Sequence, residues 1–272
     1  MFEPDHRPSP SEIDRMDLVD HVQDAYGGLD RWRAMKGFTA HVSISGAALP
    51  PPDGRPPPGV THVTVRDYGL PTAQSPKPSA RDLVVEGETT RPSVRIYGST
   101  DLNRCVLYTP RRVEFRDMAD PLHQALDEPL AALRARDAAA PLNQVERSYI
   151  FGALTWEAVA GPFLLRRSDA TLSPAKQTPA SKSSPAIDVA WPETLVPLAP
   201  RKRFHLNDHG HLVRAEYALD ALGFGTVVDT ISAPVNFGGI VVSTLRRLRA
   251  VKGGNTMSLP LIDIEIFDIR FH

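Results

Sequence analysis

Apolar positions near the start of the chain recur every three or four residues, from Ile13 to Tyr26. This spacing predicts a helix over residues 12–26. Gly27-Gly28 tolerates the positive φ that ends a helix, and we expect a short second helix up to Met35.

From Phe38 onward the spacing of apolar positions changes from helical to alternating, which is typical of strands with one buried face. The strands predicted in the first half are 39–49, 60–68, 81–88, 93–97, 105–108 and 112–116. Those predicted in the last third are 187–191, 201–206, 211–219, 225–231, 240–250 and 260–271. Close spacing of the strands indicates antiparallel hairpins.

Helical spacing returns in two segments, residues 121–137 and 142–159. In the second segment Trp156 shares an apolar stripe with Tyr149, so Trp156 is expected in the core or on the wall of a cavity. The next residue, Glu157, falls off this stripe and is expected at the surface.

The segment after the second helical pattern is expected to leave the helix, enter the sheet and then form a loop. Gly161-Pro162 is predicted to end the helix, and the short apolar run PFLLRR to enter the sheet. Residues 171–186 are rich in proline, serine and lysine and have almost no large apolar side chain. Such a segment cannot offset its ordering entropy by burial, so we predict a mobile surface loop.

About a dozen strands and four helices place the chain in the α+β class. An open antiparallel sheet of that size curls, and helices must cover one of its faces. We therefore predict a large curved antiparallel β-sheet, a half-barrel, packed around a few helices. A β-rich unit of this length can fold as one domain, so we predict a single domain over residues 1–272.

Composition restricts the partners. The 31 basic residues nearly balance the 32 acidic ones, so no strong field attracts nucleic acid. No uncharged apolar run approaches the roughly 18 residues of a membrane span, and the start of the chain lacks the apolar core of a secretory signal. We expect a cytoplasmic protein with no nucleic-acid partner and no membrane span. The oligomeric state is left open.

Three stretches resemble a known family: YGGLDRW near the start, the helix that ends in Trp156 and is followed by PFLL, and FHLNDHGHLVRAEY in the last third. The pattern resembles uncharacterised bacterial proteins related to the lipoprotein-carrier (LolA-like) superfamily. The resemblance implies a curved antiparallel sheet wrapped around helices, with an apolar cavity between them. Such relatives tend to carry histidines where this chain has Leu198, Ala215 and Val228 or Asp229. Without a signal sequence and a lipobox-type cysteine, lipoprotein transport is not expected.

Aromatic and cationic side chains meet on the predicted middle strands, at Arg95, Tyr97, Tyr108 and Arg112. Such groups can orient a carbonyl or an enolate inside a mainly apolar pocket. Arg95, Tyr97 and Tyr108 are therefore candidate catalytic residues, although the same residue types also occur on exposed sheet faces.

Two carboxylates on the last predicted strand are further candidates. Asp263 and Glu265 alternate with isoleucines and so share one face of the strand. Crowded in a cavity, they can produce the raised pKa of a general acid. Facing solvent, they are ordinary surface residues.

Candidate ligand-binding residues come from two early strands and one helix. His41 and His62 can meet across neighbouring strands, as a functional pair or as packed side chains. Tyr149 and Trp156 are expected on the wall of a ligand cavity.

A metal site is the tempting interpretation of the cluster His205, Asp208, His209 and His211, because imidazole and carboxylate bind zinc and iron. However, Asn207 to Gly210 has the composition of a hairpin turn, in which His209 points to solvent. We predict no metal. No dinucleotide, phosphate-loop or nucleophile-elbow motif occurs, so no cofactor is expected.

These observations favour a protein that holds a small hydrophobic molecule. The first hypothesis is cofactor-independent catalysis of a cyclase, isomerase or dehydratase type, possible in secondary metabolism, because proximity alone supplies several kcal/mol. The alternative is a non-catalytic carrier or binder of an apolar metabolite. A third interpretation is a structural protein whose cavity is filled by its own side chains.

Overall fold

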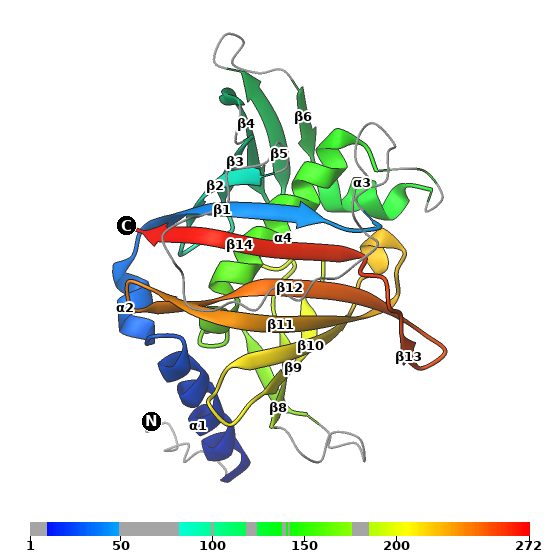
Figure 1. Ribbon diagram of the computed structural model, residues 1–272. Helices are drawn as coiled ribbons and strands as arrows, with labels where there is room; N and C mark the ends of the chain where they lie inside the picture. The colour runs from blue at the N-terminus through cyan, green and yellow to red at the C-terminus, as the bar shows by residue number, and fades with distance from the viewer. Residues whose placement is uncertain are drawn as a thin grey trace, which may run out of the picture.

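The computed structural model describes residues 10–48, 82–98, 101–117, 124–137, 140, 142–175 and 185–272. Within these ranges the strands form one antiparallel sheet of 14 strands. Figure 1 views the sheet from its outer side, with the longest helix lying behind it.

Each half of the chain builds one side of the sheet. The first half supplies β1 (Gly37–Ser45), β2 (Asp82–Glu88), β3 (Val94–Gly98), β4 (Asp101–Thr109), β5 (Arg112–Asp117) and β6 (Gln124–Asp127). The second half supplies β7 (Thr171–Pro174), β8 (Ala186–Ala190), β9 (Arg201–Leu206), β10 (Leu212–Ala218), β11 (Thr226–Phe237), β12 (Ile240–Lys252), β13 (Asn255–Thr256) and β14 (Ile262–Phe271).

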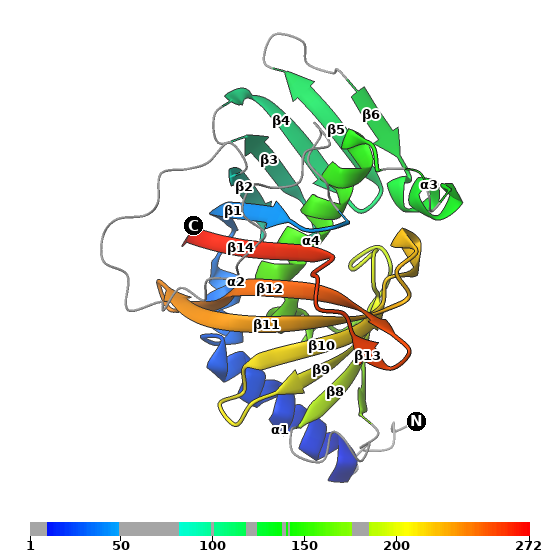
Figure 2. The same ribbon diagram turned by 45° about the vertical axis from the view of Figure 1, so that its right-hand side comes forward.

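The order of the strands is β6-β5-β4-β3-β2-β1-β14-β12-β11-β10-β9-β8-β7, and β13 pairs only with β12. The two halves therefore meet where β1 pairs with β14, with Phe38 opposite Phe271. In Figures 1 and 2 the strands β3 to β6 are steeply inclined to β14, which shows the curvature of the sheet.

Alternation along the strands separates two faces, as the sequence predicts. On β14 the side chains of Ile262, Ile264 and Ile266 are buried, whereas Asp263 and Glu265 are partly exposed. We call the face that carries the isoleucines and packs on the long helix the inner face, and the opposite one the outer face.

The long helix α4 (Gln144–Leu164) supports the inner face. Its first turn is fixed by a capping box: the Asn143 side chain accepts a hydrogen bond from the Glu146 backbone N–H at 2.9 Å, and Glu146 Oε2 accepts one from the Asn143 N–H at 2.8 Å. Nearly every later residue of α4 is buried, on all sides of the helix. Such a helix forms the centre of the core rather than its cover.

The prediction that Gly161-Pro162 ends this helix is wrong, as is the prediction that PFLLRR enters the sheet. The helix continues to Leu164 with Pro162 inside it, although an interior proline removes a backbone donor and is unfavourable in a helix. Packing fixes this last turn: the ring of Phe163 stacks on Trp32 with the centroids 4.3 Å apart.

Two helices before the sheet cover one end of it. Helix α1 (Pro10–Ala25) buries Val19 and Val22, and α2 (Leu29–Ala34) buries Trp32. Between them Tyr26 Oη lies 3.2 Å from Ser243 Oγ and accepts a hydrogen bond from the Leu212 N–H. These contacts join the start of the chain to β10 and β12.

The predicted helix over residues 121–137 is only partly correct. Residues 124–127 form the strand β6 instead, which pairs with β5, and helix α3 covers only Pro129–Ala135. Glu128, with φ 47°, separates the two elements. Pairing along the edge of the sheet here outweighs the helix propensity of alanine and leucine.

Two further predictions concern residues 171–186 and residues 60–68. Residues 171–174 were predicted as part of a mobile loop but form β7, which pairs with β8; most of the remainder lies outside the described residues. The predicted strand over 60–68 lies outside them altogether. A short 3-10 helix (Asp220–Leu222) follows β10.

The predicted fold class is confirmed: the chain forms a large, curved and unclosed antiparallel sheet around a long helix. A single domain over residues 1–272 stays a prediction. Among the helices that the structure describes, none has the length and apolar character needed to cross a membrane.

Candidate functional site

The candidate residues from the sequence divide between the two faces of the sheet. Arg95 and Tyr97 lie on the outer face, where Tyr97 Oη is 3.3 Å from Arg95 Nη1 and donates to Glu86 Oε2 at 3.2 Å. Burial, together with Glu86, raises the pKa of Tyr97, and Arg95 opposes the shift. The two residues are neighbours, but they do not face α4.

A groove of about 420 Å³ runs along this outer face. It follows a row of cross-strand neighbours, Glu86, Arg95, Leu107 and Glu114. Arg112 also lines it, held by Glu114 and Asp127. Positive and negative groups alternate here and pair with one another, so the groove has no excess of one sign.

Tyr108 lies on the inner face, apart from Arg95 and Tyr97. Its ring lies 5.4 Å from that of Tyr149 and packs against Gly152 of α4. Tyr149 Oη donates to the Pro110 carbonyl at 3.0 Å, while Tyr108 Oη is buried with no hydrogen-bond partner in the described part of the chain. Burial raises the pKa of both phenols.

Trp156 is a core residue, 1% exposed. Its indole N–H donates to the Glu88 carbonyl at 2.7 Å, so it fastens α4 to the end of β2. This position agrees with the predicted apolar stripe shared with Tyr149.

The carboxylates of β14 face outward, away from the inner space. Asp263 pairs with Arg247 at 3.3 Å. Burial raises the pKa of Asp263, although Arg247 opposes the shift. Glu265 is one step further along the same face. These two residues therefore do not join Tyr108 in one site.

The histidines are spread over separate places. His41 is exposed on β1, and its predicted partner His62 lies outside the described residues. At the 207–210 turn, Asn207 Oδ1 accepts hydrogen bonds from the backbone N–H groups of His209 and His211. His205 Nε2 instead lies 3.1 Å from Glu216 Oε1. No group of three or more potential metal ligands is found among the residues described.

Four charged side chains that sequence patterns did not bring together meet on the inner face. They are Glu157 on α4, Lys202 on β9, Asp229 on β11 and Arg246 on β12, each at most 5% exposed. Glu157 was predicted at the surface, and this prediction is wrong, because α4 is enclosed on every side.

The contacts among these residues form a continuous network. Lys202 Nζ donates to Glu157 Oε1, Arg246 Nη2 lies 3.5 Å from the same oxygen, and Arg246 Nε donates to Asp229 Oδ2 at 2.9 Å. Lys202 Nζ also lies 3.9 Å above the ring of Tyr217, and Tyr217 Oη donates to Asp229 Oδ2 at 3.4 Å. We call these five residues the inner network.

Burial and pairing act in opposite directions in the inner network. Burial alone raises the pKa of Glu157, but Lys202 and Arg246 together hold it below its ordinary value. Burial lowers the pKa of Lys202 despite the neighbouring Glu157. For Arg246, Asp229 and Glu157 outweigh burial and raise the pKa. In their ordinary ionic forms, two cations and two carboxylates balance to zero.

A signal for this network is present in the sequence. In β9, β11 and β12 the residues Lys202, Asp229 and Arg246 occupy the same phase of the alternation as buried apolar residues. A charged residue in the inward phase must be paired when buried. That rule, applied to each strand, would have selected these three positions.

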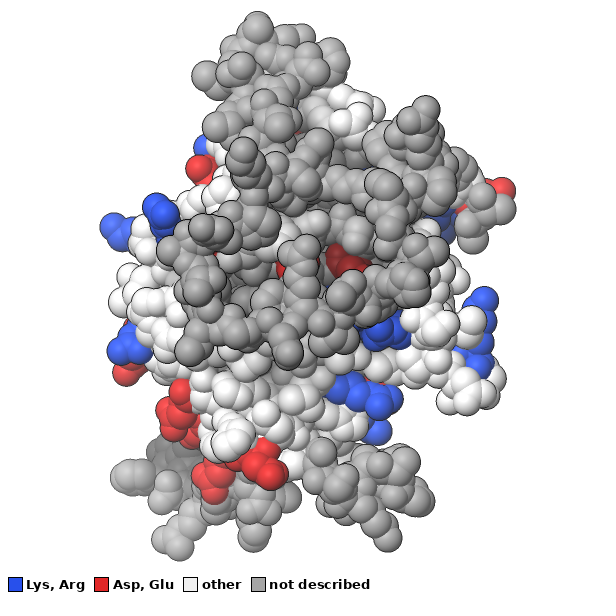
Figure 3. Space-filling model, in the orientation of Figure 1, with Lys and Arg blue, Asp and Glu red and all other residues white. Residues whose placement is uncertain are grey.

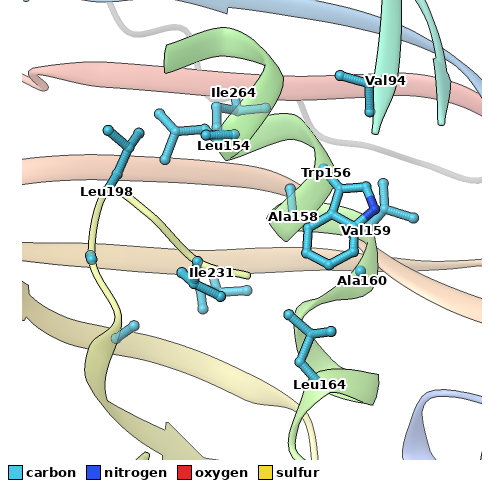
Figure 4. Close-up of a cluster of buried hydrophobic side chains, with 14 of the residues drawn as sticks. Val94, Leu154, Trp156, Ala158, Val159, Ala160, Leu164, Leu198, Ile231 and Ile264 are labelled. Atoms are coloured by element: carbon cyan, nitrogen blue, oxygen red, sulfur yellow. The ribbon is translucent and has the colours of Figure 1, made fainter. Parts of the chain in front are cut away.

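Apolar side chains border the inner network. Arg246 lies between Ile231 and Ile264, its partners on the neighbouring strands. Figure 4 shows both isoleucines in one cluster with Leu154 and Ala158 of α4 and Leu198 from the segment before β9. Of the positions where the resemblance expects histidine, Leu198, Ala215 and Asp229 are all buried.

One position on α4, three residues after Ala158, leaves room. Gly161 is buried, yet among the described residues a Cβ placed there would meet no atom within 4 Å beyond its chain neighbours and the backbone of its own helix. At Gly152, two and a half turns earlier, the neighbouring space is occupied, because a Cβ there would lie 2.3 Å from Tyr108 Cγ. In the described part of the chain, this buried Gly161 therefore borders open space, which we call the gap at Gly161.

Comparison with known proteins gives similarities of structure only. No family profile and no curated protein matches the sequence. A LolA superfamily protein from Nitrosomonas europaea has a TM-score of 0.47 at 7% identity, over 97% of this chain and 94% of that one. The sequence patterns predicted a resemblance to the same superfamily. At such identities the similarity concerns the fold.

Two other solved structures are similar. A DUF1329 family protein from Desulfovibrio piger has a TM-score of 0.46 at 10% identity, over 93% of both chains. The lipoprotein LppX from Mycobacterium tuberculosis has a TM-score of 0.23 at 11% identity, over 76% of this chain and 90% of that one.

Proposed function

We propose that this protein binds a small apolar molecule between α4 and the inner face of the sheet. The observation that supports the proposal is the open space at the buried Gly161. Gly161 lies about one helical turn from Ala158, which belongs with Leu198 and Ile231 to the apolar cluster of Figure 4. Empty core volume costs on the order of 24 cal/mol per Å³, whereas an apolar guest gains about 25 cal/mol per Å² of buried surface.

The proposal is tested by closing the space. Gly161→Leu is expected to abolish binding of the neutral apolar dye N-phenyl-1-naphthylamine, followed by its fluorescence. Gly161→Ala, which adds one methyl group, is the matched control and should retain most of the binding. Leucine and alanine also favour helix over glycine, so both variants should melt no lower than the wild type. Unchanged dye affinity in a folded Gly161→Leu variant would overturn the proposal.

A second candidate function is cofactor-independent catalysis on the same guest, such as cyclisation or isomerisation. It is favoured by the buried polar groups near the apolar cluster, which a purely apolar carrier does not need. Mass spectrometry separates the two: molecules co-purifying with the protein are identified, and then incubated with it. A carrier returns the guest unchanged, and an enzyme returns a product.

A further inference from the structure

Among the described residues, one atom of the inner network is left without a hydrogen-bond partner. Within the described residues, the side-chain hydrogen bonds of Asp229 use Oδ2, which accepts from Arg246 and from Tyr217. Asp229 Oδ1 is buried, and in the described part of the chain no donor reaches it. A buried carboxylate oxygen without a donor is unfavourable, and a network that only stabilised the core would be expected to satisfy it.

The inner network and the gap at Gly161 are adjacent. Glu157 and Gly161 are four residues apart on α4 and so lie on the same face, one turn from each other. On the sheet side, Asp229 is followed two residues later by Ile231, whose side chain lies in the apolar cluster of Figure 4. The inner network and the apolar cluster thus share both α4 and β11, and the gap lies one helical turn from Glu157.

The charge balance restricts what can bind at this end. Lys202 and Arg246 already offset Glu157 and Asp229. A carboxylate would add a negative charge beside Asp229, and an ammonium group would add an unbalanced positive one. Burying net charge is costly, whereas a neutral hydroxyl adds none and donates one hydrogen bond.

We propose that the inner network is a headgroup site and that the guest is an amphiphile with a neutral hydroxyl group, such as a long-chain alcohol, which donates to Asp229 Oδ1. This inference rests on the proposed binding of an apolar molecule beside α4. It adds the polar end of the guest and the residue that recognises it.

A series of ten-carbon ligands on the wild-type protein tests the headgroup site. The dye is displaced at pH 8 by 1-decanol, decyl methyl ether, decanoate or decylamine. The ether keeps the oxygen but has no proton to donate. Because hydrogen bonds to charged groups are the stronger ones, decanol should bind at least about tenfold more tightly than each of the others.

Two variants assign the preference to one atom. Asp229→Asn removes the negative charge from the group that accepts the hydroxyl hydrogen bond, and the preference for decanol over the ether should fall to about twofold or less. Tyr217→Phe is the matched control, because it removes a contact to Oδ2 and leaves Oδ1 unchanged; the preference should persist. The wild-type series decides the question even if Asp229→Asn fails to fold.

The failures of the two proposals look different. If the four ligands displace the dye equally, or decanoate binds most tightly, the headgroup site is wrong while binding beside Gly161 stands. If no ligand displaces the dye and Gly161→Leu leaves dye binding intact, the apolar site itself is wrong.

Discussion

The two faces of the sheet use the same residue types in opposite ways, and Arg246 and Arg247 show the difference most clearly. They are consecutive on β12, and each pairs with an aspartate, Asp229 on the inner face and Asp263 on the outer face. Arg246 is 5% exposed at its side chain and Arg247 is 36% exposed. Solvent weakens the outer ion pair, whereas removal of one member of the inner pair would leave a buried charge without its counter-ion.

Figure 3 shows the outer side of the molecule. Outside the grey atoms, lysine and arginine side chains and acidic ones form small separate groups on this face, and neither sign covers it. The ion pairs of the outer face are local, as between Arg247 and Asp263 or Arg112 and Glu114. The inner face concentrates charge in one place beside an apolar gap, which is why we assign recognition of the guest to the inner face.

The largest effect is expected from breaking the inner pair. Arg246→Met leaves the carboxylates of Asp229 and Glu157 buried without their shared cation, and should lower the free energy of unfolding by about 3–5 kcal/mol. Arg247→Met, one residue along, should lower it by at most about 1 kcal/mol. Urea unfolding of both variants measures the difference, and equal losses would contradict this account of the two faces.

A second, smaller effect compares two glycines of α4. Gly152→Ala places a methyl group against the Tyr108 ring and should cost about 1–3 kcal/mol through overpacking. Gly161→Ala meets open space and should stabilise the protein by roughly 0.5–1 kcal/mol, because alanine favours the helix. Thermal unfolding provides the comparison; a destabilised Gly161→Ala variant would show that the gap is filled.

The smallest expected effect is on the pH dependence of stability, in which the inner Glu157 and the outer Asp263 act in opposite directions. The folded protein holds the pKa of Glu157 below its ordinary value of 4.5, so this group stabilises the fold above that pH and the contribution is lost as pH falls. The pKa of Asp263 is raised from 3.8, so its protonation on acidification favours the folded state.

Unfolding midpoints from pH 7 to pH 3 separate these two contributions. Relative to the wild type, the double variant Glu157→Gln, Lys202→Met should lose less stability in acid, and Asp263→Asn should lose more. Parallel curves for all three proteins would refute the assigned shifts.

The sequence predicts the sheet well where alternation is regular. On β14 three isoleucines alternate with charged residues, so strand and inward face both follow from the pattern. Prediction fails where a long-range contact decides the structure. Strand β6 forms because β5 offers an edge, and α4 runs past Pro162 because Phe163 stacks on Trp32.

The candidate site is predicted less well than the fold. Tyr108, Tyr149 and Trp156 do lie on the inner side, but Arg95 and Tyr97 lie on the outer face. Glu157 was wrongly predicted at the surface because helical periodicity assumes one solvent-exposed face, whereas α4 is buried on all sides. The inner network joins three strands and a helix, and a pattern within any single segment cannot show that its charges meet.

The pairing of β1 with β14 has a consequence for folding. Phe38 and Phe271 are opposite each other, about 230 residues apart in the chain, and one edge of β1 has no strand beside it until β14 arrives. Closing so long a loop is entropically costly and slow. Until then the edge of β1 is open to pairing with other chains, so we expect folding and aggregation to compete at the step that joins the two halves.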